Sequence, residues 1–281
     1  MQSSHGFSLL EVLIATGFTV GVGAVILQLL QQNERTFRDQ TVMFEMQQTA
    51  RMALSQVAED IRKAGQSIPL EAGAVLMPGT GTSRLNLRGS FSGTETWVTS
   101  PLPLTAAVGE SLTVDVESVA GFSAGRQAFL WNDEGWVRAL VDSVSASSQT
   151  VRITPSAVNV SPAQFTTPPT LSTDEAVAVY WDPASSAVRR TTATNTENPK
   201  NPNWAPANEL AANVIGMTVS YYDDSGNALT SDIVAEQSNV AWIELRLTVR
   251  SSLPLSNGTR PTYSLSTRCV PRNLHIRNFG R

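Results

Sequence analysis

Few residues of this chain could do chemistry, and they form no recognised catalytic pattern. Only two histidines occur, His5 and His275, and the single cysteine is Cys269. They leave little material for a His-based metal site or a Ser-His-Asp triad. The sequence contains no phosphate-binding loop, C-x-x-C, H-E-x-x-H or G-x-S-x-G motif. We therefore predict that the protein is not an enzyme, with no catalytic residues, no metal and no cofactor.

Two further polar features invite a functional interpretation. The segment DDSGN at 223–227 offers oxygen ligands, but it lacks the spacing and the distal Glu of a calcium-binding EF-hand loop. We interpret this segment as a polar hairpin turn.

A lone cysteine cannot form an internal disulfide. Cys269 is therefore either a small buried apolar residue, which is the commoner case, or a thiol available for intermolecular pairing or reaction.

The most informative residue is Glu11, the only charge in an apolar run from Phe7 to Leu30 (24 residues). As a helix this run would span roughly 36 Å, enough to cross a hydrocarbon core of about 30 Å. It is too long for the apolar region of a cleaved secretory signal peptide, which has about 7–15 residues. A carboxylate in a spanning helix costs about 2.5–3.5 kcal/mol and normally has a partner. A cut after Gly6 would create an α-amino group about one turn away, on this chain or on a neighbour.

Small residues within the same run suggest close helix packing. Gly17 and Gly21 form a G-x-x-x-G pair, and such pairs let spanning helices approach each other closely. The plain alternative is that glycine is simply tolerated in a membrane helix, although it lowers helix propensity by about 1 kcal/mol per residue.

The helix is expected to continue beyond the apolar run. Neither Gly nor Pro occurs between Leu30 and Gly65, and apolar residues recur every three or four positions. This spacing is typical of one face of an α-helix. The residues of this stripe are Met43, Met46, Ala50, Leu54, Val57, Ile61 and Ala64. We predict one helix from Phe7 to about Ala64, roughly 87 Å long, that ends at Gly65.

The remainder of the chain, from residue 66, is predicted to be rich in β-structure, because Gly, Pro, Ser and Thr become frequent and alternating runs appear. The expected strands lie in the segments 84–89, 96–100, 111–119, 126–132, 135–146, 149–155, 175–182, 186–192, 214–223, 240–252 and 262–270. Hairpin turns are expected in 131–136, 179–190 and 221–230, and loops in 161–173 and 191–209. Apolar residues make up 41% of the chain, enough to build a core.

The first residues of the apolar run, GFSLLEVLIA from Gly6, resemble the class III signal of type IV prepilins. This signal has a short leader, Gly at the cut, Phe next and Glu at the fifth mature position. The resemblance implies that a prepilin peptidase cuts after Gly6 and N-methylates Phe7, and that Glu11 acts in assembly. The segment ARMALSQVAEDIRKAG at 50–65 is similar to the end of this helix in PilW-type minor pilins and in the J pseudopilin of type II secretion.

The resemblance implies an α+β, type IV pilin-like fold. One long N-terminal helix, with a transmembrane half and an amphipathic half, would pack on an antiparallel β-sheet domain with an inserted β-rich region at 120–146. The parts would be a leader at 1–6, a transmembrane half at 7–30, an amphipathic half at 31–65 and a β-rich head at 66–281.

The same resemblance implies a minor pilin that takes part in pilus assembly initiation or in a tip complex. It would cross the inner membrane once, with its head in the periplasm, and reach the pilus or cell surface after assembly. Its partners would be the prepilin peptidase, other minor and major pilins, the inner-membrane assembly platform and the lipid bilayer. Two alternatives stay open: the J pseudopilin of type II secretion, and a pilus-displayed module that binds DNA or a surface.

The carboxyl-terminal segment is a further candidate contact. The formal net charge of the chain is −4, which argues against a globally basic nucleic-acid binder. After Arg250, however, there is no Asp or Glu, and basic residues follow at Arg260, Arg268, Arg272, Arg277 and Arg281. This segment could contact an acidic partner pilin or DNA phosphates. The plain alternative is a solvated strand edge that acidic neighbours in the fold balance.

Overall fold

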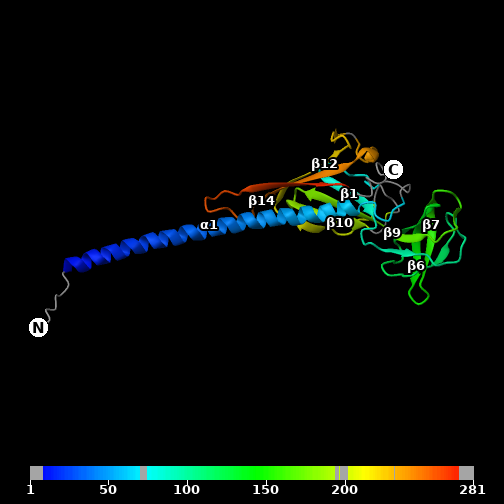
Figure 1. Ribbon diagram of the computed structural model, residues 1–281, viewed down its shortest axis with the longest axis horizontal. Coiled ribbons are helices and arrows are strands. Elements are labelled where there is room, and N and C mark those ends of the chain that lie inside the picture. Colours follow the sequence, from blue (N-terminus) through cyan, green and yellow to red (C-terminus); the bar gives the residue numbers. More distant parts are fainter. Residues whose placement is uncertain (1–8, 70–74, 194–195, 197–201, 231, 272–281) are drawn as a thin grey trace. The chain divides into compact units, whose positions relative to one another are not determined.

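A computed structural model describes residues 9–69, 75–193, 196, 202–230 and 232–271 (Figure 1). The chain divides into two compact units, each considered by itself. The first unit comprises the chain up to Gln48 together with 250–262, and the second comprises 49–249 together with the chain from Tyr263.

One continuous helix, α1 (Leu9–Lys63), contributes to both units and contains 55 residues. The prediction of a single helix to about Ala64 is confirmed over the described residues. Gly65 follows with a φ of 77°, a left-handed conformation that glycine adopts readily at helix ends. Its N–H donates to the carbonyl oxygen of Arg88 over 2.7 Å, which gives the chain a partner where the helical hydrogen bonds stop.

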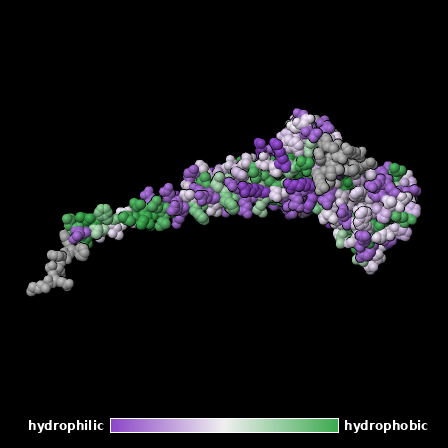
Figure 2. All heavy atoms as spheres, in the orientation of Figure 1, coloured by the Kyte–Doolittle hydropathy of each residue, from purple (hydrophilic) through white to green (hydrophobic). Residues whose placement is uncertain are grey.

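In the first unit, the amino-terminal part of α1 leaves its apolar side chains uncovered. Leu9 is 81% exposed and Phe18 is 73% exposed, and the apolar surface gathers over this part of the helix (Figure 2). Further along, Val42 and Met46 are buried. The connection between the last two strands reaches α1 at Asp39, whose two carboxylate oxygens accept from the Ser256 N–H (2.8 Å) and hydroxyl (2.6 Å).

In the second unit, the carboxyl-terminal part of α1 buries one stripe against the sheet domain. The predicted core positions of this part, Ala50, Leu54, Val57, Ile61 and Ala64, are all buried. Three to four residues separate successive members, so they lie on one side of the helix. The amphipathic pattern that the sequence shows is therefore used to cover the β-domain.

The largest sheet has nine strands, and its described pairs are antiparallel. Its main path is β11 (Asn208–Ala211), β10 (Ala187–Ala193), β9 (Thr170–Asp182), β5 (Gln127–Trp131), β6 (Trp136–Ser145), β7 (Thr150–Val158) and β4 (Leu112–Asp115). Off this path, β1 (Arg84–Gly89) and β2 (Glu95–Trp97) also pair with β9.

Two smaller sheets complete the β-structure. The first has the order β13 (Ala228–Leu229), β12 (Val214–Tyr222), β14 (Trp242–Arg250) and β15 (Thr262–Cys269). The second pairs β3 (Leu104–Ala106) with β8 (Ala163–Phe165). A short 3-10 helix, η1 (Gln237–Asn239), precedes β14.

The long strand β9 changes partners along its 13 residues. Residues 170–174 pair with β5 and residues 170–172 also pair with β2, whereas residues 175–180 pair with β1 and 176–182 with β10. The strands around the first half enclose a hydrophobic cluster of their own, which includes Phe165 and Leu171. Figure 1 shows β6 and β7 of this half together, away from β12 and β14.

Every segment expected to hold a strand does so, and the three expected hairpins are confirmed. Cα partners across the turns are Trp131 with Trp136, Asp182 with Ala187, and Tyr222 with Ala228. The strands β3, β8 and β11, which have three or four residues each, were not predicted, and β13 was predicted only as part of the hairpin at 221–230.

The predicted loop at 161–173 is wrong in part, because it contains β8 and the first residues of β9. Ala163 and Phe165 point into the core while Gln164 is exposed, so three residues suffice for a strand where β3 supplies the pairing. Of the predicted loop at 191–209, β10 takes the first residues and β11 begins at Asn208. Residues 202–207 form no helix or strand, and 194–195 and 197–201 lie outside the described residues.

Candidate functional site

The apolar segment at the amino end of α1 has the length and composition of a membrane span. Among the described residues, α1 is the one helix that qualifies by these two criteria, and no residue of its apolar window is buried. Glu11 is exposed within it. No described residue forms an ion pair or hydrogen bond with its carboxylate.

The threonines of this segment differ from Glu11 in having partners on the helix itself. The hydroxyl of Thr16 donates to the carbonyl oxygen of Val12 over 2.9 Å, and that of Thr19 donates to Ala15 over 2.8 Å. Such bonds satisfy a hydroxyl in hydrocarbon without help from another chain. Gln28 lies near the other end of the segment. Glu11 is therefore the one charged residue of this apolar segment, and no described group on the helix pairs with it.

Gly17 and Gly21 lie on one side of the helix and leave an open groove. A Cβ atom built at either glycine would meet nothing within 4 Å, so no packing inside the described chain requires glycine there. The groove is lined by Ile14, Gly17, Phe18, Gly21, Val22, Val25 and Ile26. An apolar surface with small residues at its centre is suited to a second helix at short distance.

Several predicted site residues lie outside the described residues. These are Gly6 and Phe7, at the predicted processing site, and Arg272, Arg277 and Arg281 of the basic segment. Arg268 is described. It lies on β15 with its guanidinium 4.6 Å from the ring centre of Trp242, and its Nε is 4.0 Å from Oε2 of Glu244. An acidic neighbour within the fold thus accompanies Arg268, as the plain alternative expects, while a contact with a partner or DNA stays a prediction.

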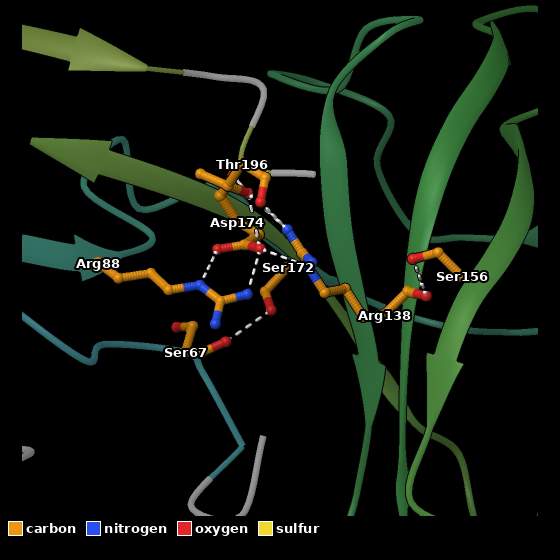
Figure 3. Close-up of polar contacts among 7 residues, drawn as sticks. All are labelled: Ser67, Arg88, Arg138, Ser156, Ser172, Asp174 and Thr196. Carbon is orange, nitrogen blue, oxygen red and sulfur yellow. Dashed lines mark hydrogen bonds and ion pairs between the residues drawn. The ribbon is translucent and has the colours of Figure 1, made fainter. Parts of the chain in front are cut away.

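A buried polar cluster, which the sequence analysis missed, lies where β9 changes partners (Figure 3). Asp174 is fully buried, and its carboxylate accepts two bonds from Arg88, at 2.7 and 2.6 Å. It also accepts from Arg138 Nε at 2.9 Å and from the Thr196 hydroxyl at 2.8 Å. Arg138 donates in turn to the Thr196 backbone carbonyl.

This cluster ties together strands from both halves of the nine-stranded sheet. Arg88 belongs to β1, Arg138 to β6, and Asp174 to β9 between them. A buried carboxylate is costly unless it is paired and hydrogen-bonded, and here all of its contacts are charge-assisted or from a hydroxyl. The signal in the sequence was the Asp-Glu pair at 174–175 directly before the apolar run 176–179, since buried charges imply partners elsewhere in the chain.

A second buried ion pair fixes the carboxyl end of α1 to β10. Asp60 is 2% exposed, and its carboxylate accepts from Arg190 Nε at 2.8 Å and Nη2 at 3.0 Å. This two-bond geometry sets both the position and the rotation of the last helical turns. Hydrogen bonding to Asp60 raises the pKa of Arg190 above its usual value.

The remaining chemical candidates are placed as follows. Cys269 is buried, as the commoner interpretation predicted, and burial raises the pKa of its thiol. The segment at 223–227 forms the predicted turn, with the Asn227 N–H donating to Asp223 Oδ1 at 2.7 Å. Within the described ranges, no group of three or more His, Cys, Asp or Glu residues could hold a metal ion.

Comparison with known proteins gives no family for this chain. No protein-family model matches the sequence, and no curated protein is significantly similar to it.

Proposed function

We propose that the protein is a pilin-like subunit, a minor pilin of the type IV pilus machinery. One observation carries the proposal. A single helix joins an exposed apolar segment, whose one carboxylate has no partner among the described residues, to a stripe that is buried on a β-domain. The prepilin-like residues Gly6, Phe7 and Glu11 support it further, as does the resemblance of 50–65 to PilW-type subunits.

In this proposal the apolar segment of α1 first anchors the chain in the inner membrane, with the β-domain outside the cytoplasm. Cleavage after Gly6 frees the α-amino group of Phe7. When subunits assemble, the apolar helices pack together and water leaves the contact. Glu11 then pairs with the amine of an adjacent subunit, because an unpaired carboxylate in low dielectric is costly. A one-turn error in axial position would leave Glu11 unpaired, so this contact selects the register.

The groove at Gly17 and Gly21 serves the same step. Without side chains at these positions, the backbone of a neighbouring helix can approach closely and gain van der Waals contacts. Larger residues at either position would hold the helices apart and lengthen the distance from Glu11 to its partner.

Mass spectrometry of the protein isolated from a piliated host tests the first step. We expect an amino terminus at N-methylated Phe7. An intact leader, or a cut elsewhere, would contradict the proposal.

The second test compares Glu11→Gln with Glu34→Gln, which removes an exposed carboxylate elsewhere on α1. We expect both variants to be processed, but only Glu11→Gln to be lost from sheared fibres, by about tenfold or more. Equal incorporation of the two variants would remove the assigned role of Glu11. A gene deletion that impairs protein secretion while leaving pili intact would instead indicate the J pseudopilin.

A further inference from the structure

Three neighbouring strands place two tryptophans on one face of the nine-stranded sheet. The Cα partner of Trp97 on β2 is Thr170 on β9, and the partner of Thr170 on the other side is Trp131 on β5. Directly paired residues project to the same face. Adjacent strands are about 4.8 Å apart, so the two tryptophan backbones lie roughly 10 Å apart with Thr170 between them.

The two indoles are part of the wall of a cleft with a volume of about 410 Å³. Its lining consists of Glu95, Thr96, Trp97, Glu117, Ser118, Trp131 and Thr170. Trp97 is 57% exposed, which is unusual for a large aromatic side chain in a protein with a well-filled core. The cleft thus combines two tryptophans with two glutamates, and none of its described lining residues is basic.

A chain of hydrogen bonds holds one side of the cleft in place. Trp131 Nε1 donates to the Ser172 hydroxyl (3.2 Å), and that hydroxyl donates to the carbonyl oxygen of Ser67 (2.7 Å). The Ser67 hydroxyl then donates to Glu95 Oε2 (2.5 Å). Ser67 adopts a left-handed conformation, with a φ of 54°, which places its carbonyl and hydroxyl groups in this chain. Trp131 and Glu95 are therefore preorganised relative to each other.

Hydrogen bonds from two backbone N–H groups position the opposite side of the cleft. The Glu117 N–H donates to the carbonyl oxygen of Trp97 over 3.1 Å, and the Ser118 N–H donates to the Thr96 hydroxyl over 3.1 Å. These contacts hold Glu117 beside Trp97. Among the described residues, neither Glu95 nor Glu117 takes part in an ion pair. The fold thus fixes the backbone of Glu117, and no described residue pairs with its carboxylate.

We propose that this cleft binds a guanidinium group, presented by an exposed arginine side chain of a partner polypeptide. A guanidinium is planar, so it can stack on an indole face, and its N–H groups can donate to carboxylates at the same time. An ammonium group lacks the plane, and a neutral sugar could stack but would leave the two negative charges without a cation. The inference does not depend on the proposed pilus function.

The test uses the full chain in detergent micelles, with the ¹H–¹⁵N indole signals of the six tryptophans as the readout. Nα-acetyl-arginine methylamide is the probe, and single Trp→Phe variants assign the signals. We expect saturable shifts of the Trp97 and Trp131 signals only. The lysine analogue should need several-fold higher concentrations. Absence of saturable shifts with the arginine probe, or an equal response to the lysine analogue, would overturn the proposal.

A matched pair of variants tests the carboxylate. Glu117→Gln should weaken binding of the arginine probe about tenfold, because a charge-assisted hydrogen bond becomes a neutral one. Glu110→Gln, which removes an exposed carboxylate outside the cleft, should leave the binding unchanged. Equal effects of the two changes would show a general response to protein charge and overturn the proposal. Cellotetraose, a neutral sugar, provides a further control. If it shifts the Trp97 and Trp131 signals, and Glu117→Gln leaves these shifts unchanged, the cleft binds a neutral sugar and the proposal is overturned.

Discussion

Each end of α1 places a carboxylate among apolar side chains, but the two carboxylates differ in burial and in hydrogen-bond partners. At the carboxyl end, Asp60 is buried and accepts two hydrogen bonds from Arg190. Near the amino end, Glu11 is exposed and has no polar partner among the described residues. The apolar neighbours differ in the same way, since Leu54 is 3% exposed and Leu27 is 62% exposed.

This difference shows which part of the helix is covered by its own chain and which part is not. The β-domain supplies both apolar cover and a counter-charge for the last turns of α1, so that part is complete within one chain. The amino-terminal part has the same kinds of residues without the cover. Because apolar surface of this extent is unfavourable in water, we expect lipid or other chains to surround it. The predictions below separate self-contained interactions from those that need a partner.

The largest effect is expected for the best-paired carboxylate, Asp174. Asp174→Ala would remove the carboxylate that accepts from both Arg88 and Arg138, so the buried guanidinium of Arg88 would lose its ion-pair partner. Breaking a buried pair in this way costs about 3–5 kcal/mol of the free energy of unfolding. Urea unfolding of the full chain in micelles, followed by tryptophan fluorescence, measures the change. Asp133→Ala, at an exposed turn position, should stay within about 0.5 kcal/mol. A similar small change for Asp174→Ala would show that the cluster is not needed for stability.

Leucine truncation at the two ends of α1 tests the comparison most directly. Leu54→Ala should lower the unfolding free energy of the β-domain by about 2–5 kcal/mol, because it removes buried methyl groups and leaves a cavity. Leu27→Ala makes the same chemical change on an exposed surface, so the same unfolding transition should move by less than about 0.5 kcal/mol. Comparable losses for the two variants would mean that the amino end of α1 also packs within its own chain.

Removal of the Asp60 carboxylate should have an intermediate effect. The side chain of Arg190 is 24% exposed, so water can partly solvate it once its partner is lost. We therefore expect Asp60→Ala to cost about 2 kcal/mol, below the range for a fully buried pair. The adjacent Glu59 pairs with Lys63 on the helix surface at 2.7 Å, and Glu59→Ala should cost about 0.5 kcal/mol or less. Similar losses in unfolding free energy for the two variants would contradict the assigned difference.

Local periodicity accounts for most of what the sequence could predict. The helix, its buried stripe and eleven strand segments follow from spacings within a few residues. Short strands such as β3 and β8 do not, because three residues are too few to show an alternation. The long strand β9, which follows β8 in the chain, was predicted correctly only over its second half, since Pro168 and Pro169 precede its start.

Contacts between distant positions could not be derived in the same way. Arg88 and Asp174 are 86 positions apart, and Asp60 and Arg190 are 130 apart. Their pairing depends on which strands adjoin, which local patterns do not encode. The Trp97–Trp131 cleft has the same origin, because two strands separated in sequence meet on either side of β9. In contrast, Glu11 could be identified from one stretch of sequence, and its role in assembly stays a prediction.

The smallest effect on stability is expected at Asp39, which lies between the two ends of α1. Hydrogen bonding from the Ser256 side chain is the largest effect on the pKa of Asp39 and lowers it below the usual 3.8. Burial opposes this shift, and the Ser256 backbone N–H adds a smaller lowering. At pH values above the pKa of the unfolded state, the ionised carboxylate contributes its full stabilisation to the contact. This contribution is lost as the pH falls through the lower pKa of the folded state. The contact between α1 and Ser256 should therefore persist at neutral pH and weaken only below about pH 3.8.

The Ser256 amide proton reports this titration by NMR. Its chemical shift should change with a midpoint below 3.8, and Asp39→Asn should abolish the change. Because Asp39 is solvated, the global unfolding free energy should barely respond, in contrast to Asp60 at the buried end of the helix. A midpoint at or above the usual aspartate value would mean that Ser256 does not bind the ionised carboxylate.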